Sequence, residues 1–351
     1  MAGPALVRTS NPEGKLSMSD PSRLPRLRQH AGTAGSCPPA SLAPARSSRV
    51  LAALAAVVVL GGCAGGAPTM DDDVIIVSGA SGQLGGVAVL ELLARGVAPE
   101  NLILVSRTPE QLDEYARMGA STRFGDFSQP ESLSAAYEGG DRLLLISLNT
   151  RGNPNPDVRT QRVEFHKNAI DAAVAVGVEH IVYISYVDAD NNPSPIAVDH
   201  RLTEAILRES GVAWTFIRDQ WYMDRFLRQA ASVVEEGRVV AGPQAGTAFV
   251  TRADCAAAAA AALSTPGHEN RIYEITGPEL IGSREFAAII GELTGQTIEV
   301  AEAASEDAEL TVPDMPSGTM LTGDFQELVG RPPTSVRQLL EANREAWAQE
   351  R

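Results

Sequence analysis

The feature that most restricts the fold is a strand, a glycine-rich turn and a helix in immediate succession between residues 74 and 96. Val74 to Ser78 is a short apolar run, typical of a strand buried on both faces of a parallel sheet. After the turn, apolar residues recur at i, i+4 spacing until Gly96 ends the helix. Because glycines let the backbone approach a pyrophosphate and the helix N-terminus offers N–H groups, the pattern predicts a phosphate cradle rather than an ordinary glycine turn. The predicted cofactor-binding residues of the turn are Gly79, Ala80, Ser81, Gly82, Gln83, Leu84 and Gly85.

The end of the next strand indicates which dinucleotide binds. A site for NAD usually has an Asp or Glu here, which holds the ribose 2′-hydroxyl. This chain has Arg107, whose guanidinium can fork onto a 2′-phosphate and stack on adenine. NADP is therefore favoured over NAD, and a plain surface arginine is the alternative. Four further cofactor contacts are predicted at the ends of the third and fourth strands, near the adenine (Asp126, Phe127) and the nicotinamide (Ile146, Ser147).

Strand and helix patterns then alternate. Helices are expected at 163–176 and 196–210, and strands at 143–147, 181–185 and 213–217. Such alternation predicts an α/β fold with a doubly wound parallel sheet of Rossmann type and right-handed crossovers. Beyond Arg218 the pattern is irregular, with helices expected near 223–234, 253–263, 284–293 and 336–347 and a Pro-rich loop at 303–318. We therefore expect a leader and tether over 1–72, an NAD(P)-binding Rossmann domain over 73–217 and a smaller α/β substrate lobe over 218–351.

The leader resembles an export signal. Residues 1–49 are rich in Pro, Ser, Ala and Arg without an apolar period, which is typical of disorder. Val50 to Leu60 is an apolar run of eleven residues, shorter than the roughly 20 that a membrane span needs but suited to a signal peptide. It ends in Leu-Gly-Gly-Cys, which resembles the lipobox of bacterial lipoproteins and predicts lipidation of Cys63 and a membrane anchor. The alternative is a cytoplasmic protein whose translation starts at Met70.

Charge and cysteine content narrow the function classes. The net charge is −15 for the whole chain, +5 before Met70 and −20 after it. An acidic body argues against nucleic acid or an anionic membrane surface as partner.

Cys37, Cys63 and Cys255 form no disulfide framework or metal spacing, and Cys255 is expected to be a small buried residue. His200 and Glu204 lie one helical turn apart and His166 lies in the preceding helix, but no third ligand has a suitable spacing, so no metal is predicted. The oligomeric state is left open.

Many reductases and epimerases of this fold use a Tyr-x-x-x-Lys pair, in which the lysine lowers the tyrosine pKa. The chain has two lysines, Lys15 and Lys167, and neither follows a tyrosine at that spacing. This excludes sugar epimerases and ordinary alcohol dehydrogenases. It favours a hydride transfer that needs little proton catalysis, such as reduction of a quinone stacked on the cofactor.

Several stretches resemble the NmrA-like atypical short-chain dehydrogenases, and most of all their NAD(P)H:quinone oxidoreductase type 2 group. They are GASGQLGG, LVSRTPEQL, GDFSQPESL, NAIDAAVAVGVEHIVYIS, DHRLTEAILRESGVAWTFIR and LVGRPPTSVRQLL, and they span nearly all of the chain from Val74. The resemblance implies an NADPH-binding Rossmann domain with a small C-terminal lobe and a quinone or similar conjugated acceptor.

The chain departs from this family where the acceptor is expected. Asp188 replaces the histidine of the family's SLLHAD, and Asp219 replaces the asparagine of RNGWY. Two acidic residues there would change the charge beside the acceptor, so a non-catalytic, NADP(H)-sensing regulatory protein is the alternative function. Trp221 and Tyr222 are expected to line a flat apolar pocket or to pack in the core. The candidate acceptor-pocket residues are Tyr186, Asp188, His200, Asp219, Trp221 and Tyr222.

Overall fold

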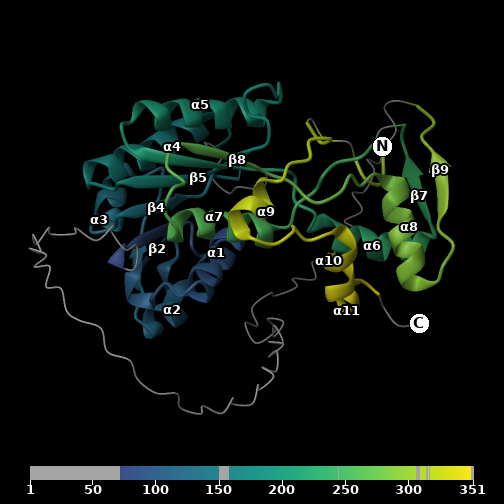
Figure 1. Ribbon diagram of the computed structural model, residues 1–351, viewed down its shortest axis with the longest axis horizontal. Coiled ribbons are helices and arrows are strands. Elements are labelled where there is room, and N and C mark those ends of the chain that lie inside the picture. Colours follow the sequence, from purple (N-terminus) through teal and green to yellow (C-terminus); the bar gives the residue numbers. More distant parts are fainter. Residues whose placement is uncertain are drawn as a thin grey trace, which may run out of the picture. The chain divides into compact units, whose positions relative to one another are not determined.

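The computed structural model describes residues 72–149, 158–243, 245–305, 309–313, 315 and 317–348; the predicted leader and Cys63 lie outside them. Within this part of the chain, seven parallel strands form one sheet in the order β3-β2-β1-β4-β5-β6-β8 (Figure 1). The strands are β1 (Ile75–Ser78), β2 (Leu102–Ser106), β3 (Ser121–Phe124), β4 (Arg142–Leu145), β5 (His180–Tyr186), β6 (Ala213–Asp219) and β8 (Arg271–Ile275). The order reverses between β1 and β4, and in doubly wound sheets a ligand binds at the carboxyl ends of the strands where this happens. The expected fold class is confirmed.

Helices cover both faces of the sheet (Figure 1). The helices are α1 (Gln83–Ala94), α2 (Asp113–Met118), α3 (Leu133–Tyr137), α4 (Val158–Ala175), α5 (Pro195–Glu209) and α7 (Arg252–Ser264). Every residue from Asp254 to Leu263 in α7 is buried, because its alanines let the helix pack closely on α1. Cys255 is fully buried in this helix, as the sequence predicts. The strands in the middle of the sheet are buried along their length, as expected for a sheet covered on both sides.

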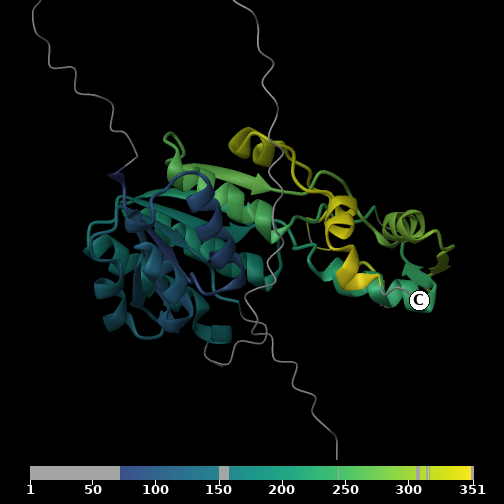
Figure 2. The ribbon, with the colours of Figure 1, turned by 90° about the horizontal axis from the view of Figure 1, so that it is seen from below.

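A second apolar core lies beyond the sheet. Its elements are α6 (Arg225–Glu236), β7 (Arg238–Ala241), α8 (Ser283–Thr294), β9 (Glu299–Glu302), α10 (Val336–Ala342) and α11 (Arg344–Trp347). β7 and β9 pair in parallel, and α10 and α11 pack on α6 (Figure 2). The indole N–H of Trp347, a fully buried residue, donates to the carbonyl of Leu340, 2.8 Å away.

The expected boundary at residues 217 and 218 does not match the sheet. After α6 and β7 the chain returns, so that α7 packs on α1 and β8 pairs with β6. A last helix, α9 (Asp324–Val329), also packs on α7. Residues 218–351 are therefore not one separate lobe, because segments of that range complete the sheet and its helical layer.

Most expected helices are confirmed to within a few residues. The helix expected at 336–347 is instead two helices, because Asn343 leaves helical geometry and its side-chain amide donates to the carbonyl of Leu339, 2.8 Å away. The strands β7, β8 and β9 lie in the part of the sequence without a regular pattern. In the described residues no helix is long and apolar enough to cross a bilayer. Nor do His, Cys, Asp and Glu side chains gather there in a group of three or more that could hold a metal ion.

Candidate active site

The glycine turn has the geometry that a phosphate cradle requires. Gly79 has φ of +90°, a conformation that side chains disfavour. A Cβ at Gly85 would stand 2.2 Å from the carbonyl oxygen of Gly79, so only glycine fits where the helix crosses the turn. Gly79, Ser81, Gly82 and Gln83 are exposed, whereas Ala80, Leu84 and Gly85 are buried beneath them. The turn thus presents bare backbone to a ligand.

The N-terminus of α1 supplies the donors. Gly82 is the N-cap and has no side chain to cap the helix. Within the described residues, no acceptor receives the N–H groups of Gln83 and Leu84. Unpaired N–H groups at the positive end of the helix dipole favour an anion, so the turn and helix fit a pyrophosphate.

Arg107 lies beside this turn. Ser106, the last residue of β2, shares a hydrogen bond of 2.6 Å with the Ser81 hydroxyl, which brings the end of β2 against the glycine turn. Arg107 follows it and is exposed, and in the described part of the chain no carboxylate forms an ion pair with it. A guanidinium in this position is available to a 2′-phosphate.

The other predicted cofactor contacts differ in exposure. Asp126 is half-buried, and its Oδ1 accepts hydrogen bonds from the N–H and the hydroxyl of Ser128 at 2.9 and 2.8 Å. The Phe127 ring is buried edge-on against His166 in the core. Ile146 and Ser147 are half-buried after β4, and Ile146 lies 3.8 Å from where a Cβ of Gly79 would be. The end of β4 therefore borders the glycine turn.

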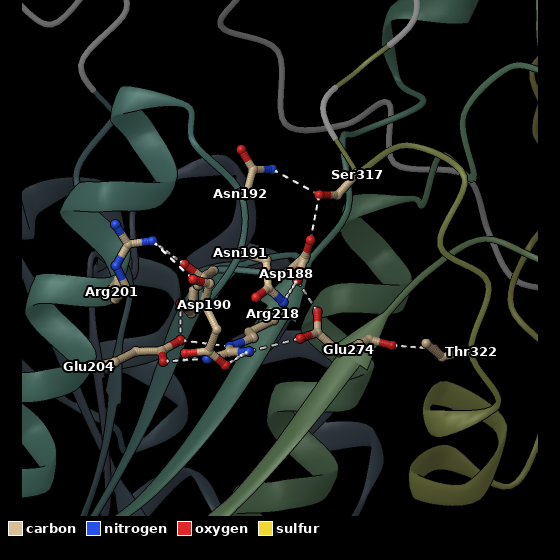
Figure 3. A network of polar contacts seen from close by, with 12 residues as sticks. Asp188, Asp190, Asn191, Asn192, Arg201, Glu204, Arg218, Glu274, Ser317 and Thr322 are labelled. Carbon is tan, nitrogen blue, oxygen red and sulfur yellow. Dashed lines mark hydrogen bonds and ion pairs between the residues drawn. The ribbon is translucent and has the colours of Figure 1, made fainter. Parts of the chain in front are cut away.

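Both carboxylate oxygens of Asp188 accept hydrogen bonds within the protein. Its Oδ1 accepts from Asn191 at 2.8 Å and its Oδ2 from the Ser317 hydroxyl at 2.7 Å (Figure 3). Its backbone N–H donates to the carboxylate of Glu274 at 2.9 Å, and its φ of +51° fits this tight turn. Asp188 therefore ties the segment after β5 to the segment that precedes α9.

Arg218 stands at the centre of the same network (Figure 3). It forks onto Glu204 with contacts of 2.9 and 2.7 Å and donates to Asp190 and Glu274, each at 2.9 Å. The hydrogen bond from Arg218 holds the pKa of Asp190 below its ordinary value. Glu204 is fully buried, so it depends on this pairing.

Asp219 is buried rather than open to a pocket. It is 4% exposed; its Oδ2 accepts from the Tyr222 hydroxyl at 2.8 Å, and its Oδ1 has no partner in the described residues. Burial raises the pKa of Asp219 to about 7, and the neighbouring Cys255 thiol and Tyr222 hydroxyl offset part of the rise. Arg252 lies 4.6 Å over the Tyr222 ring but pairs with Asp224, at 2.9 Å.

The predicted polar contact from His200 to the acceptor is wrong in this structure. His200 is 3% exposed, and both its ring nitrogens already have partners, Arg162 and Tyr183. Tyr186 stacks over the imidazole with ring centroids 5.8 Å apart. His200 therefore lies in the packed interior, beneath the Tyr186 ring.

An apolar cluster surrounds Tyr186. Tyr186 packs with Val187 and Ala197, and Trp221 and Met320 pack against them. The Trp221 ring stands edge-on to Tyr186, at 5.9 Å. Burial raises the pKa of Tyr186 to about 12, and the neighbouring Trp221 and Ser194 offset part of the rise. In the described residues, however, the polar side-chain atoms of these three residues have no hydrogen-bond partner of good geometry.

The sequence analysis did not single out Arg162, Glu274, Ser317 or Met320, and it considered His166 only as a metal ligand. One feature of the sequence could have indicated two of these residues, Arg162 and His166. Arg162 and His166 lie one turn apart on the face of α4 that otherwise buries apolar residues such as Phe165 and Ala169. A polar pair on a buried helix face needs partners, which indicates a built contact.

The comparisons with known proteins agree with this geometry. Residues 79–266 match the model of a family described as NAD(P)H-binding. Quinone oxidoreductase 2 of Escherichia coli is 34% identical over 247 residues, which are 70% of this chain and 83% of the relative. An NmrA-like family domain-containing oxidoreductase of Aspergillus flavus is 28% identical over 305 residues, 78% of this chain and 97% of the relative. The crystal structure of Citrobacter sp. triphenylmethane reductase complexed with NADP(H) superposes with a TM-score of 0.66 at 30% identity, over 78% of this chain and 99% of that chain. The expected resemblance is confirmed, and the chain belongs to the NAD(P)H-binding family of NmrA-like oxidoreductases.

Proposed function

We propose that this protein transfers a hydride from NADPH to a quinone or a similar flat, conjugated acceptor. The observation that carries the proposal is the exposed Arg107, which has no carboxylate partner among the described residues, beside a bare glycine turn and an uncapped helix N-terminus. Together they match a dinucleotide that carries a 2′-phosphate. The names of the quinone oxidoreductase and of the NADP(H)-bound reductase support the same cofactor and reaction class.

The acceptor side suits a flat apolar molecule. When bound, the reduced nicotinamide supplies the hydride, and the protein must orient the acceptor and exclude water from the transfer. The aromatic rings of Tyr186 and Trp221 with Met320 offer an apolar wall. Lys167, the lysine in the described part, is exposed and pairs with Asp171 at 2.5 Å. No lysine there assists a tyrosine in delivering the proton that completes the reduction.

A cofactor-preference experiment tests the proposal on the full-length protein. Absorbance of NADPH and of NADH is followed with a panel of benzoquinones and naphthoquinones. We expect Arg107→Ala to lower the preference for NADPH by about ten- to hundredfold, the worth of hydrogen bonds to a charged group. Arg337→Ala, at an exposed arginine that pairs with Glu292, is the matched control and should change nothing.

Each outcome decides between functions. An unchanged preference in Arg107→Ala would contradict the role of Arg107. Tight NADPH binding without reduction of any quinone in the panel would contradict the reductase function and favour an NADP(H)-sensing protein.

We also propose that Cys63 carries a lipid that holds the protein at a membrane. The support is the apolar run and lipobox-like end in the sequence. Ten residues, from Ala64 to Asp73, separate this cysteine from the first strand segment and reach about 35 Å at most when extended. An enzyme held so close to the bilayer would meet lipid-soluble quinones. Fractionation of cells expressing the full-length protein and Cys63→Ser tests this; a soluble, lipid-free wild type that begins at Met70 would contradict it.

A further inference from the structure

Both polar backbone groups of Leu148 are held by side chains of α4. The Leu148 N–H donates to Nε2 of His166 at 2.9 Å, and its carbonyl accepts from Nε of Arg162 at 2.8 Å. Leu148 follows Ile146 and Ser147, the residues that border the glycine turn. A loop backbone on the ligand side of a sheet is commonly bonded to water or left mobile, whereas this one is fixed at two atoms.

The two side chains are themselves supported by a buried polar chain. His166 is fully buried and Arg162 is 3% exposed. Nδ1 of His166 lies 3.1 Å from the Thr203 hydroxyl on α5, and Nη2 of Arg162 lies 2.8 Å from Nε2 of His200. The other ring nitrogen of His200 lies 2.9 Å from the Tyr183 hydroxyl on β5. Side chains of α5 and β5 therefore hold Arg162 and His166 in place.

Donor and acceptor chemistry allows one protonation state for this chain. A backbone N–H and a guanidinium can only donate, so Nε2 of both His166 and His200 must accept. Each imidazole is therefore neutral, with its proton on Nδ1. Burial, and next the positive charge of Arg162, lower the pKa of both histidines well below the ordinary value, which agrees with the neutral form. The pair thus holds Leu148 without changing state near neutral pH.

We propose that Arg162 and His166 are positioning residues that fix the segment Ile146 to Leu148 against the nicotinamide end of the cofactor. The inference rests on the proposed function and on the predicted contact of Ile146 and Ser147 with the nicotinamide at the end of β4. Hydride transfer requires near-attack geometry, and small displacements of a positioning group lower the rate strongly. The adenine and phosphate end is bound by other parts, the glycine turn and Arg107, so the pair should affect one end of the cofactor alone.

The test compares two ligands on full-length variants. NADPH carries the nicotinamide, and 2′-phospho-ADP-ribose lacks it, so their dissociation constants report on the two ends of the site separately. His166→Leu removes the acceptor for Leu148, and His166→Gln returns an amide oxygen to about the same place. His180→Leu is the matched control, because His180 is equally buried (2% exposed) and hydrogen-bonded to Thr215 but lies at the opposite end of β5.

We expect His166→Leu to weaken NADPH binding about tenfold, the worth of one buried hydrogen bond, and to weaken 2′-phospho-ADP-ribose less than twofold. His166→Gln should restore NADPH binding, and His180→Leu should change neither constant. Equal weakening of both ligands, or none, overturns the inference. If His166→Leu does not fold, Arg162→Met is judged by the same two constants.

The same data separate this inference from the proposed function. A wild type that binds no NADPH overturns the proposed function and the inference with it. A wild type that binds NADPH and reduces no acceptor overturns only the proposed reaction. Equal NADPH binding in wild type, His166→Leu and Arg162→Met overturns only the positioning role.

Discussion

Replacing Asp219 by asparagine should remove a loss of stability that the wild type suffers as the pH rises. The carboxyl group is 4% exposed, accepts one hydrogen bond from Tyr222 and has no cationic partner in the described residues. Its pKa is raised to about 7 in the folded state and is about 3.9 when the chain is unfolded. Between these values the folded chain holds a proton that the unfolded chain has lost, so stability falls as the pH rises. The loss is about 1.4 kcal/mol per pH unit and levels off near the folded pKa of about 7, so between pH 5 and pH 8 it amounts to about 3 kcal/mol.

The assay is urea unfolding of the full-length wild type and Asp219→Asn at half-unit steps from pH 5 to 8. The difference in unfolding free energy between the two proteins should grow by about 3 kcal/mol in favour of the variant and level off above pH 7 to 8. Tyr222→Phe removes a donor to the carboxylate and so raises its pKa in the folded state; in this variant the loss should continue to higher pH before it levels off. Parallel pH curves for wild type and Asp219→Asn would refute the reasoning, because they would mean that the carboxyl is ionised or solvated in the folded protein.

Two further substitutions test buried polar groups by their effect on stability. Tyr186→Phe removes a buried hydroxyl that has no partner of good geometry in the described residues. Thermal unfolding should therefore show that the free energy of unfolding rises by about 1 kcal/mol. A fall in this free energy would mean that the hydroxyl is hydrogen-bonded. Arg218→Met leaves the fully buried Glu204 without its forked partner and should cost about 3–5 kcal/mol in urea unfolding, whereas a cost below about 1 kcal/mol would contradict the central role of Arg218.

The fold and the cofactor half of the site could be predicted because their signals are local. The strand, glycine turn and helix around Gly79 to Gly85 are contiguous, and each glycine has a geometric reason that acts within a few residues. Arg107 follows a strand whose end is determined by the sheet order. In such cases the sequence spacing alone brings the residues together at the ends of β1 and β2.

The acceptor half depends on pairs that are distant in the sequence, and there prediction failed. Asp188 meets Ser317 across 129 positions, and Arg218 meets Glu274 across 56. His200 looked available because nothing near it in the sequence shows that Arg162 and Tyr183 use both its nitrogens. The boundary at 217 failed for a related reason, since β8 joins the sheet only after the chain has left it and returned.

The contacts in the structure also change the interpretation of Asp188 and Asp219, the two acidic residues that depart from the family. In the sequence, Asp188 and Asp219 suggest a negative acceptor site, which would repel the charge that develops on a quinone oxygen. In the structure the Asp188 carboxylate accepts from Asn191 and Ser317, and burial raises the pKa of Asp219 to about 7, so about half of this group is protonated at that pH. Both carboxyl groups are engaged in hydrogen bonds within the protein: Asp188 with Asn191 and Ser317, and Asp219 with Tyr222. The wall that remains is apolar and aromatic, so the acids do not argue against hydride transfer to a quinone, and selectivity should follow the shape and flatness of the acceptor more than its charge.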